Sequence, residues 1–320
     1  MQIFKNILFV LILLILLTGV SGWMNSAAKD EDLVQGRNKI ISRIRREPDQ
    51  TIDVLVMGDS LSYSSVAPLI LWKNHGITSY VCGQPGQKIP ETYYLLKTAL
   101  EKQSPKLLIL ETNVLFREQG KLDGLEKSVA EAGNYHFPIF RFHDIWKPLL
   151  MEKLYKGENY KGFEIRDGVQ SCEEENYMKE SAEKKEMGEN VEGYMERIME
   201  LCRKKNVEIL LLSTPSPQNY NYRKHNALVE YAQKHNLSYM NMNMSVKEIG
   251  IDWKTDSLDK GDHLNLSGAC KVTAYLGEYL DKSEWKLPDH RGDAALSAWE
   301  KEAEEFEQKV KEKLKVMQGK

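Results

Sequence analysis

Residues 51–61 read T-I-D-V-L-V-M-G-D-S-L and join a short apolar run to an abrupt polar end. The apolar run is broken only by Asp53, and it stops at Gly58-Asp59-Ser60. Buried central strands of α/β proteins have this pattern. Because such proteins bind ligands at the carboxyl ends of their parallel strands, a serine that directly follows a strand is well placed to react. Gly, Asp and Ser also cluster in ordinary turns, so these three residues need support from the rest of the chain.

Strand-like and helix-like segments alternate along most of the chain. This alternation predicts an α/β domain with a parallel sheet. It lapses between about residues 114 and 188, which we interpret as an insertion in the domain. The predicted strands after the first are residues 77–82, 106–110, 207–212 and 237–242, and the predicted helices are residues 66–72, 91–100, 191–204 and 222–235.

Composition restricts the classes of function. The 320 residues are 42% hydrophobic and 28% charged, with a net charge of −3, so the chain has no general basic surface for nucleic acid. The four cysteines are far apart and form no C-x-x-C pair, so there is no zinc-binding signature. We expect Cys82, Cys202 and Cys270 to be buried free thiols, because each lies in an apolar strand-like or helix-like pattern.

The amino terminus carries an export segment. Lys5 precedes the apolar residues 7–20, and no charged residue occurs between Asn6 and Ala28. A segment of this kind directs a chain out of the cytoplasm. It is long enough to cross a bilayer, which takes roughly 20 residues. Residues 1–28 are therefore predicted to be a membrane anchor or a cleaved signal peptide, which makes the protein extracytoplasmic, either anchored or secreted.

Three further segments lie within the predicted domain of residues 30–282 or follow it. Residues 30–49 suit an amphipathic lead-in helix. Within the insertion, the aromatic residues 135–146 could cover an active site or form a satellite hydrophobic core. Residues 283–320 are predicted to be a charged helical extension, either a surface helix or a helix that docks on a partner. Its narrow apolar stripe consists of Ala295, Trp299, Ala303, Phe306 and Val310.

Ester chemistry on a serine requires a base, an acid that orients the base, and donors for the oxyanion. Ser60, Gly83 and Asn113 follow the first three predicted strands, so they should meet at one edge of the sheet. His263 precedes the last helix of the domain, in the segment that returns to this edge. We expect Ser60 as nucleophile and His263 as base. The expected oxyanion donors are the backbone amides of Ser60 and Gly83 and the side-chain amide of Asn113; glycine at 83 would let substrate approach the backbone.

These residues lie in four ordered blocks: Gly58-Asp59-Ser60-Leu61, Gly83, Asn113 and Asp262-His263-Leu264-Asn265. The set resembles the blocks of the SGNH (GDSL) hydrolase superfamily over residues 52–280, interrupted by the insertion. The resemblance implies a flavodoxin-like three-layer α/β/α fold with a parallel sheet, a Ser-His-Asp site, no metal and no cofactor. In its export segment, insertion and D-H-L-N block, the chain is similar to extracytoplasmic acyl-transfer members. These include the DltD-like proteins of teichoic acid D-alanylation and relatives that acylate surface polysaccharides.

The aspartate departs from the pattern. Many superfamily members carry it three residues before the histidine, where this chain has Lys260. A one-residue bulge at Lys260-Gly261 could bring Asp259 to the imidazole, or Asp262 could cap the following helix or serve directly. Both aspartates therefore stay candidates.

The predicted function is that of a serine esterase or O-acyltransferase acting on acyl esters of a cell-surface glycan or polymer. A membrane-bound O-acyltransferase is an expected partner if the reaction is transfer. One alternative is a catalytically silent scaffold that binds polymer and presents its terminal helix to such an acyltransferase. Another is a secreted lipase, which would need a broad apolar entrance.

Overall fold

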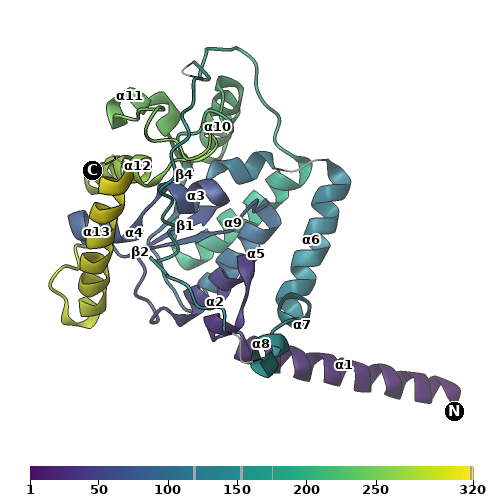
Figure 1. Cartoon of the computed structure of the whole chain (residues 1–320). Helices are drawn as coiled ribbons and strands as arrows, with labels where there is room; N and C mark the ends of the chain where they lie inside the picture. Colours follow the sequence, from purple (N-terminus) through teal and green to yellow (C-terminus); the bar gives the residue numbers. More distant parts are fainter. Residues whose placement is uncertain (118–119, 152–153, 175, 318, 320) are drawn as a thin grey trace.

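The computed structural model describes residues 1–117, 120–151, 154–174, 176–317 and 319. Its centre is a five-stranded parallel sheet with the strand order β2-β1-β3-β4-β5 (Figure 1). This is the flavodoxin-like order, whose crevice opens between β1 and β3, so the predicted fold class is confirmed. The strands are β1 (Val54–Gly58), β2 (Ser79–Gly83), β3 (Leu107–Glu111), β4 (Glu208–Ser213) and β5 (Ser238–Asn241).

Helices cover both faces of the sheet. Successive side chains of a strand point to opposite faces, so Leu55 and Met57 of β1 belong to one apolar cluster and Val54 and Val56 to the other. Helices α5 and α9 contribute to the first cluster, and α12 contributes to both, with Val272, Leu276 and Leu280 in the second. The helices are α1 (Gln2–Ala27), α2 (Lys39–Arg46), α3 (Ser60–Ser65), α4 (Pro68–His75), α5 (Ile89–Ala99), α6 (Lys121–His136), α7 (Ile139–Phe142), α8 (Trp146–Met151), α9 (Glu189–Lys205), α10 (Tyr222–His235), α11 (Val246–Ile249), α12 (Leu266–Lys282) and α13 (Ser297–Met317).

The predicted helix at residues 66–72 is wrong in its bounds. The chain instead forms α3, which begins at Ser60, and α4, which begins at Pro68. Val66 and Ala67 between them are extended, and Ala67 is so because the residue before a proline avoids helical geometry. The reactive serine therefore starts a helix of its own.

The lead-in segment is less helical than predicted. Two 3₁₀ turns, η1 (Glu31–Leu33) and η2 (Gly36–Asn38), precede the short helix α2. Gly36 has φ of 63° and interrupts any continuous helix. The basic side chains of α2 are paired, since Arg43 and Arg46 both bind Glu31.

The insertion contains α6, α7 and α8 and then a long coil. Part of the aromatic stretch joins the main core: Phe142 and Ile145 are buried there, and the ring of Tyr135 lies 5.3 Å from that of Tyr94. Other members, Phe140 and Trp146, are exposed. The stretch thus extends the core of the domain and also leaves aromatic side chains on the surface.

Helix α13 packs on the domain. Its Trp299 ring lies 5.4 Å from the Trp72 ring of α4, and Trp72 Nε1 donates to Glu300 at 3.1 Å. Phe306 is 2% exposed and contacts the ring of Phe163. Of the two interpretations, the structure therefore favours the surface helix, because four of the five stripe residues are buried against the chain itself; Ala295 is exposed and lies in the 3₁₀ turn Ala294–Leu296, before α13.

The four cysteines are free thiols. Cys82, Cys172 and Cys202 are buried, and Cys270 is half-buried. Burial raises the pKa of the Cys270 thiol to about 11, which keeps it protonated at neutral pH.

Candidate active site

Ser60 is delivered by a tight turn between β1 and α3. Asp59 is the N-cap of α3, and its Oδ1 accepts a hydrogen bond from Leu61 N at 2.9 Å. A Cβ at Gly58 would lie 2.6 Å from Glu111 Cβ, so only glycine fits at the end of the strand. Ser60 is 8% exposed and sits where β1 and β3 diverge at the switch point of the sheet.

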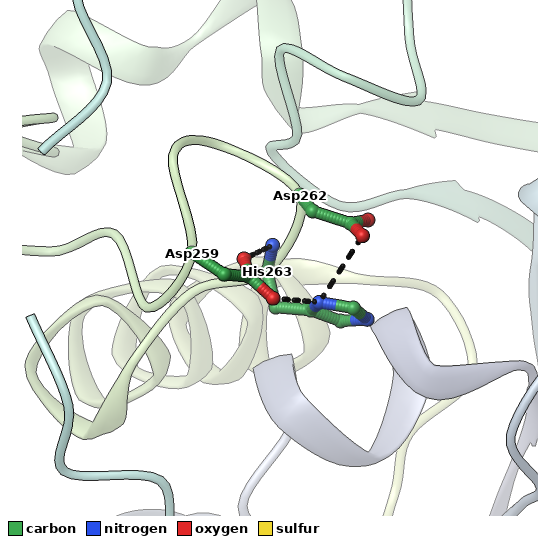
Figure 2. Close-up of side chains that lie close together, drawn as sticks. All are labelled: Asp259, Asp262 and His263. Carbon is green, nitrogen blue, oxygen red and sulfur yellow. Dashed lines mark hydrogen bonds and ion pairs between the residues drawn. The ribbon is translucent and has the colours of Figure 1, made fainter. Parts of the chain in front are cut away.

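His263 lies between Ser60 and a carboxylate. Its Nε2 is 2.7 Å from Ser60 Oγ, and its Nδ1 is 2.7 Å from Asp259 Oδ2. The other oxygen of Asp259 accepts the backbone N–H of His263 at 2.7 Å (Figure 2). These contacts give the geometry of a Ser-His-Asp triad, which suits an imidazole that donates from Nδ1 to Asp259 and accepts from the serine through Nε2.

A left-handed turn brings Asp259 to the imidazole. Lys260 has φ of 60° and Gly261 has φ of 88°, so two successive residues reverse the chain between the aspartate and the histidine. Asp262 stands farther away, with its Oδ2 3.7 Å from His263 Nδ1 (Figure 2). Its Oδ1 accepts a hydrogen bond from Asn219 Nδ2 at 2.6 Å.

Gly83 lies beside Gly58, its register partner on β1. A Cβ at position 83 would lie 2.4 Å from Ser62 Oγ and 2.9 Å from Tyr63 Cδ1. The close approach is therefore made by the chain's own helix α3, and this corrects the expectation that glycine is there to admit substrate. The backbone of Gly83 still borders the cavity next to Tyr63, where a substrate carbonyl could reach it.

Asn113 follows β3 in the 3₁₀ turn η3 (Thr112–Phe116). Its Nδ2 donates to Asp59 Oδ2 at 2.8 Å, and its Oδ1 accepts from Lys224 Nζ at 3.1 Å. A carboxylate can only accept and an ammonium can only donate, so Nδ2 of the amide must face Asp59 and Oδ1 must face Lys224. The second hydrogen of Nδ2 makes only a long contact of 3.4 Å with Asn219 Oδ1, so an oxyanion could replace it.

Asn113 belongs to a largely buried network of polar and charged side chains. Glu111 is fully buried, and burial together with the nearby Asp59 raises its pKa to about 8. Arg117 forms an ion pair with Asp59. Burial lowers the pKa of Lys224 to about 8, against the attraction of both carboxylates. The Tyr220 hydroxyl donates to Glu111 Oε1 at 2.5 Å.

Most of this network could not be predicted from the sequence. Glu111 was visible as a carboxylate at the end of an apolar strand, which is a costly position without partners. Asn219 and Lys224 carried no local signal, because they reach the site from the segment before α10 and from α10 itself, more than one hundred residues away in sequence.

A strap of residues 160–172 connects the serine and histidine elements. In Figure 1 this strap belongs to the teal coil that passes in front of the strands. Glu164 N donates to Tyr63 O at 3.0 Å, next to the nucleophile helix. Lys260 N donates to Gln170 O at 3.1 Å, in the turn that presents His263. The strap therefore fixes the distance between α3 and the histidine turn.

Asp259, Asp262 and His263 are also close enough to one another to ligate a metal ion (Figure 2). Both imidazole nitrogens already have partners, since Nδ1 faces Asp259 and Nε2 faces Ser60. A metal on Nδ1 would have to displace the 2.7 Å contact with Asp259. The arrangement of donors and acceptors thus suits proton transfer better than metal binding.

Asn113→Ala should lower kcat for ester cleavage by about 10²–10³-fold, the usual effect of losing one oxyanion donor. The fold should persist, because Asp59 keeps its ion pair with Arg117. Steady-state kinetics on a soluble ester and a thermal melt would measure both effects. A rise in KM at unchanged kcat would instead assign Asn113 to ground-state binding of substrate.

Comparisons with known proteins give similarity in structure alone. No family model matches the sequence, and no curated protein matches it. A proposed acylhydrolase from Bacteroides fragilis is 12% identical over 76% of this chain and 94% of its own, with a TM-score of 0.40. A GDSL-like lipase from Bacteroides thetaiotaomicron is 15% identical over 72% and 87% of the two chains, with a TM-score of 0.37.

A two-domain esterase active on acetylated mannans is also similar, at 13% identity over 82% of this chain. The match covers 57% of that esterase, and the TM-score is 0.36. Similarities of this size carry no weight for activity. The chemistry of this chain is inferred from the contacts among Ser60, His263 and Asp259.

Proposed function

We propose that this protein is an extracytoplasmic serine esterase or O-acyltransferase of the SGNH type, acting on acyl esters of a cell-surface glycan or polymer. The observation that carries the proposal is the pair of 2.7 Å contacts that link Ser60 Oγ, His263 and Asp259. Such a chain of contacts lets the imidazole take the serine proton while the carboxylate stabilises the imidazolium.

The reaction would proceed in two halves. Ser60 Oγ attacks the acyl carbonyl carbon as its proton passes to His263 Nε2. The oxyanion is stabilised by the backbone N–H groups of Ser60 and Gly83 and by Asn113 Nδ2. The carbon–oxygen bond to the leaving alcohol then breaks, and this alcohol takes the proton from His263. Water or a sugar hydroxyl, deprotonated by His263, finally attacks the acyl-serine and restores Ser60.

A cavity beside Gly83 could hold part of a glycan substrate; its lining includes Gly83 but not Ser60, Asn113 or His263. It has a volume of about 500 Å³, within the range of small-ligand sites. Its lining combines cationic and other polar groups, which can bind sugar hydroxyls, with aromatic residues of which Tyr160 is partly exposed and Tyr63 and Phe163 are buried. The aromatic members are Tyr63, Tyr160 and Phe163, and the cationic members are Arg37, Lys39 and Arg43.

The amino-terminal helix supports the extracytoplasmic location. Helix α1 is the one helix in the described part of the chain that is long and apolar enough to cross a membrane, with a mean hydropathy of 2.6 over its best window. Its apolar side chains are exposed from Ile3 to Leu16, as expected of a segment that contacts lipid. A retained anchor would keep the site of Ser60 on the extracytoplasmic side of the membrane.

The two alternatives are less well supported. The scaffold hypothesis needed a free terminal helix, and the stripe of α13 is buried on its own domain. The lipase hypothesis needed a broad apolar entrance; the cavity beside Gly83, which borders this expected oxyanion donor but not Ser60, is lined by charged as well as aromatic residues.

A fluorophosphonate probe should label Ser60 in the purified full-length protein, and His263→Ala should prevent the labelling. With an acetylated oligosaccharide, mass spectrometry after an acid quench should detect one acyl group on Ser60. Adding an unacetylated oligosaccharide distinguishes transfer from hydrolysis, because transfer yields a newly acylated acceptor. Absence of labelling while a control serine esterase is labelled in the same sample would overturn the proposal.

A further inference from the structure

Exposed apolar side chains gather on the insertion. Among the described residues outside α1, fourteen large hydrophobic side chains are exposed, and nine of them fall between residues 122 and 154. Leu122 is 82% exposed and Leu150 is 75% exposed. We call these nine residues the apolar face: Leu122, Leu125, Val129, Phe140, Trp146, Leu149, Leu150, Met151 and Leu154. Soluble surfaces rarely carry so many in one region unless the region binds something.

The apolar face lies beside the point where α1 leaves the body of the protein. Helix α7 contacts both α1 and α6. Asn25 of α1 lines the same small crevice as Pro138 and Phe142, at the two ends of α7. In Figure 1, α7 and α8 lie at the base of α1, and α6 runs across the direction in which α1 projects. A bilayer crossed by α1 would therefore present its surface to this side of the molecule.

No flexible spacer separates α1 from the α/β domain, which we call the body of the protein. The carboxyl-terminal end of α1 is packed, since Ser21 and Met24 are buried and Ala28 is 0% exposed. Arg45 of α2 donates to Asn25 Oδ1 at 2.8 Å and attaches the helix end to the domain. A helix of 26 residues is about 39 Å long at about 1.5 Å per residue, and the hydrocarbon core is about 30 Å thick. The body must therefore sit directly on the lipid headgroups.

We propose that α6, α7 and α8 form a second membrane contact, in which the apolar face inserts into the headgroup boundary of the leaflet next to the body. The occupant is the lipid surface itself. Trp146 and Trp23 are 46% and 51% exposed, and tryptophan is the residue that favours this boundary. Leu122, Leu125 and Val129 follow one another at intervals of three and four along α6, so they form one face of a helix lying flat on the bilayer.

This contact would have a consequence for the reaction. A protein anchored by one helix can turn about its attachment, whereas two contacts fix its orientation. The strap and the histidine turn would then stay at a constant height above the membrane. Substrates that extend from the membrane surface would reach Ser60 at a defined distance from their attachment point.

The test uses the full-length chain in liposomes of phosphatidylcholine and phosphatidylglycerol. A photoreactive benzophenone amino acid replaces Leu125 or Leu150, and the matched control carries it at Val316, which is 72% exposed on α13. Figure 1 shows that end of α13 on the side away from α1. After irradiation, lipid adducts at positions 125 and 150 should exceed those at 316 severalfold. Equal yields at all three positions, or adducts to a second copy of the chain in place of lipid, would overturn the proposal.

A charge variant provides a second readout. The double substitution Leu125→Glu and Leu150→Glu should sharply reduce lipid adducts from a benzophenone at Leu149, while the melting temperature stays near that of the parent. Both replaced side chains are exposed, so the fold has little reason to change. An unchanged adduct yield in a folded variant would count against insertion of the apolar face.

Discussion

Ser60→Ala should lower kcat for ester cleavage by at least about 10⁴-fold and abolish the acyl-enzyme, with no loss of fold. The serine hydroxyl is the group whose proton His263 accepts, at 2.7 Å, and alanine removes it without changing the backbone. Little stability should be lost, because His263 stays bound to Asp259 and the turn stays capped by Asp59. Initial rates on a nitrophenyl ester and a thermal melt give the two quantities.

The matched control is Ser64→Ala, one turn farther along the same helix. Ser64 Oγ makes a single hydrogen bond to Leu61 O at 3.4 Å and no contact with His263. This variant should retain kcat within about tenfold, a limit that corresponds to about 1.4 kcal/mol in the barrier. Turnover by Ser60→Ala at a rate similar to that of Ser64→Ala would show that the measured esterase activity does not come from this serine.

The elements that place Ser60, Gly83 and Asn113 could be predicted because each depends on a local pattern. An apolar run that stops at small or polar residues predicts a buried strand and its carboxyl end, and parallel strands bring those ends to one edge. β2 and β3 begin within two residues of their predicted starts, and α10 has its predicted bounds. Prediction was weaker for α3, because six residues with four serines give no helical periodicity.

The choice between the two aspartates could not be made from sequence. It depends on the left-handed conformations of Lys260 and Gly261, and a lysine rarely adopts positive φ. The partner of α13 could not be predicted either, since an apolar stripe has the same pattern whether it packs on its own domain or on another protein. The orientation of Asn113 depends on Asp59 and Lys224, which only the tertiary structure brings together.

Asp259→Asn should lower kcat by about 10⁴-fold, because it changes which nitrogen of His263 carries the proton. Asp259 accepts two hydrogen bonds, one from His263 N and one from Nδ1, both at 2.7 Å. An asparagine has one oxygen and one NH₂ group, so one of the two donors would face another donor. If the backbone N–H keeps the oxygen, the NH₂ group faces Nδ1 and the imidazole proton moves to Nε2. The ring could then no longer accept the proton of Ser60.

Asp262→Asn is the matched control, with the same chemical change three residues away. Its Oδ2 is 3.7 Å from His263 Nδ1, and its side chain is 46% exposed, so its interaction with the imidazole is weak. Its other oxygen accepts from Asn219, a contact that asparagine Oδ1 can keep. We expect kcat within about tenfold of the parent. Rates of both variants measured across pH 5 to 9 would separate the two aspartates. A 10⁴-fold loss in Asp262→Asn, with little loss in Asp259→Asn, would assign the orienting role to Asp262. The turn at Lys260-Gly261 would then have to rearrange during the reaction.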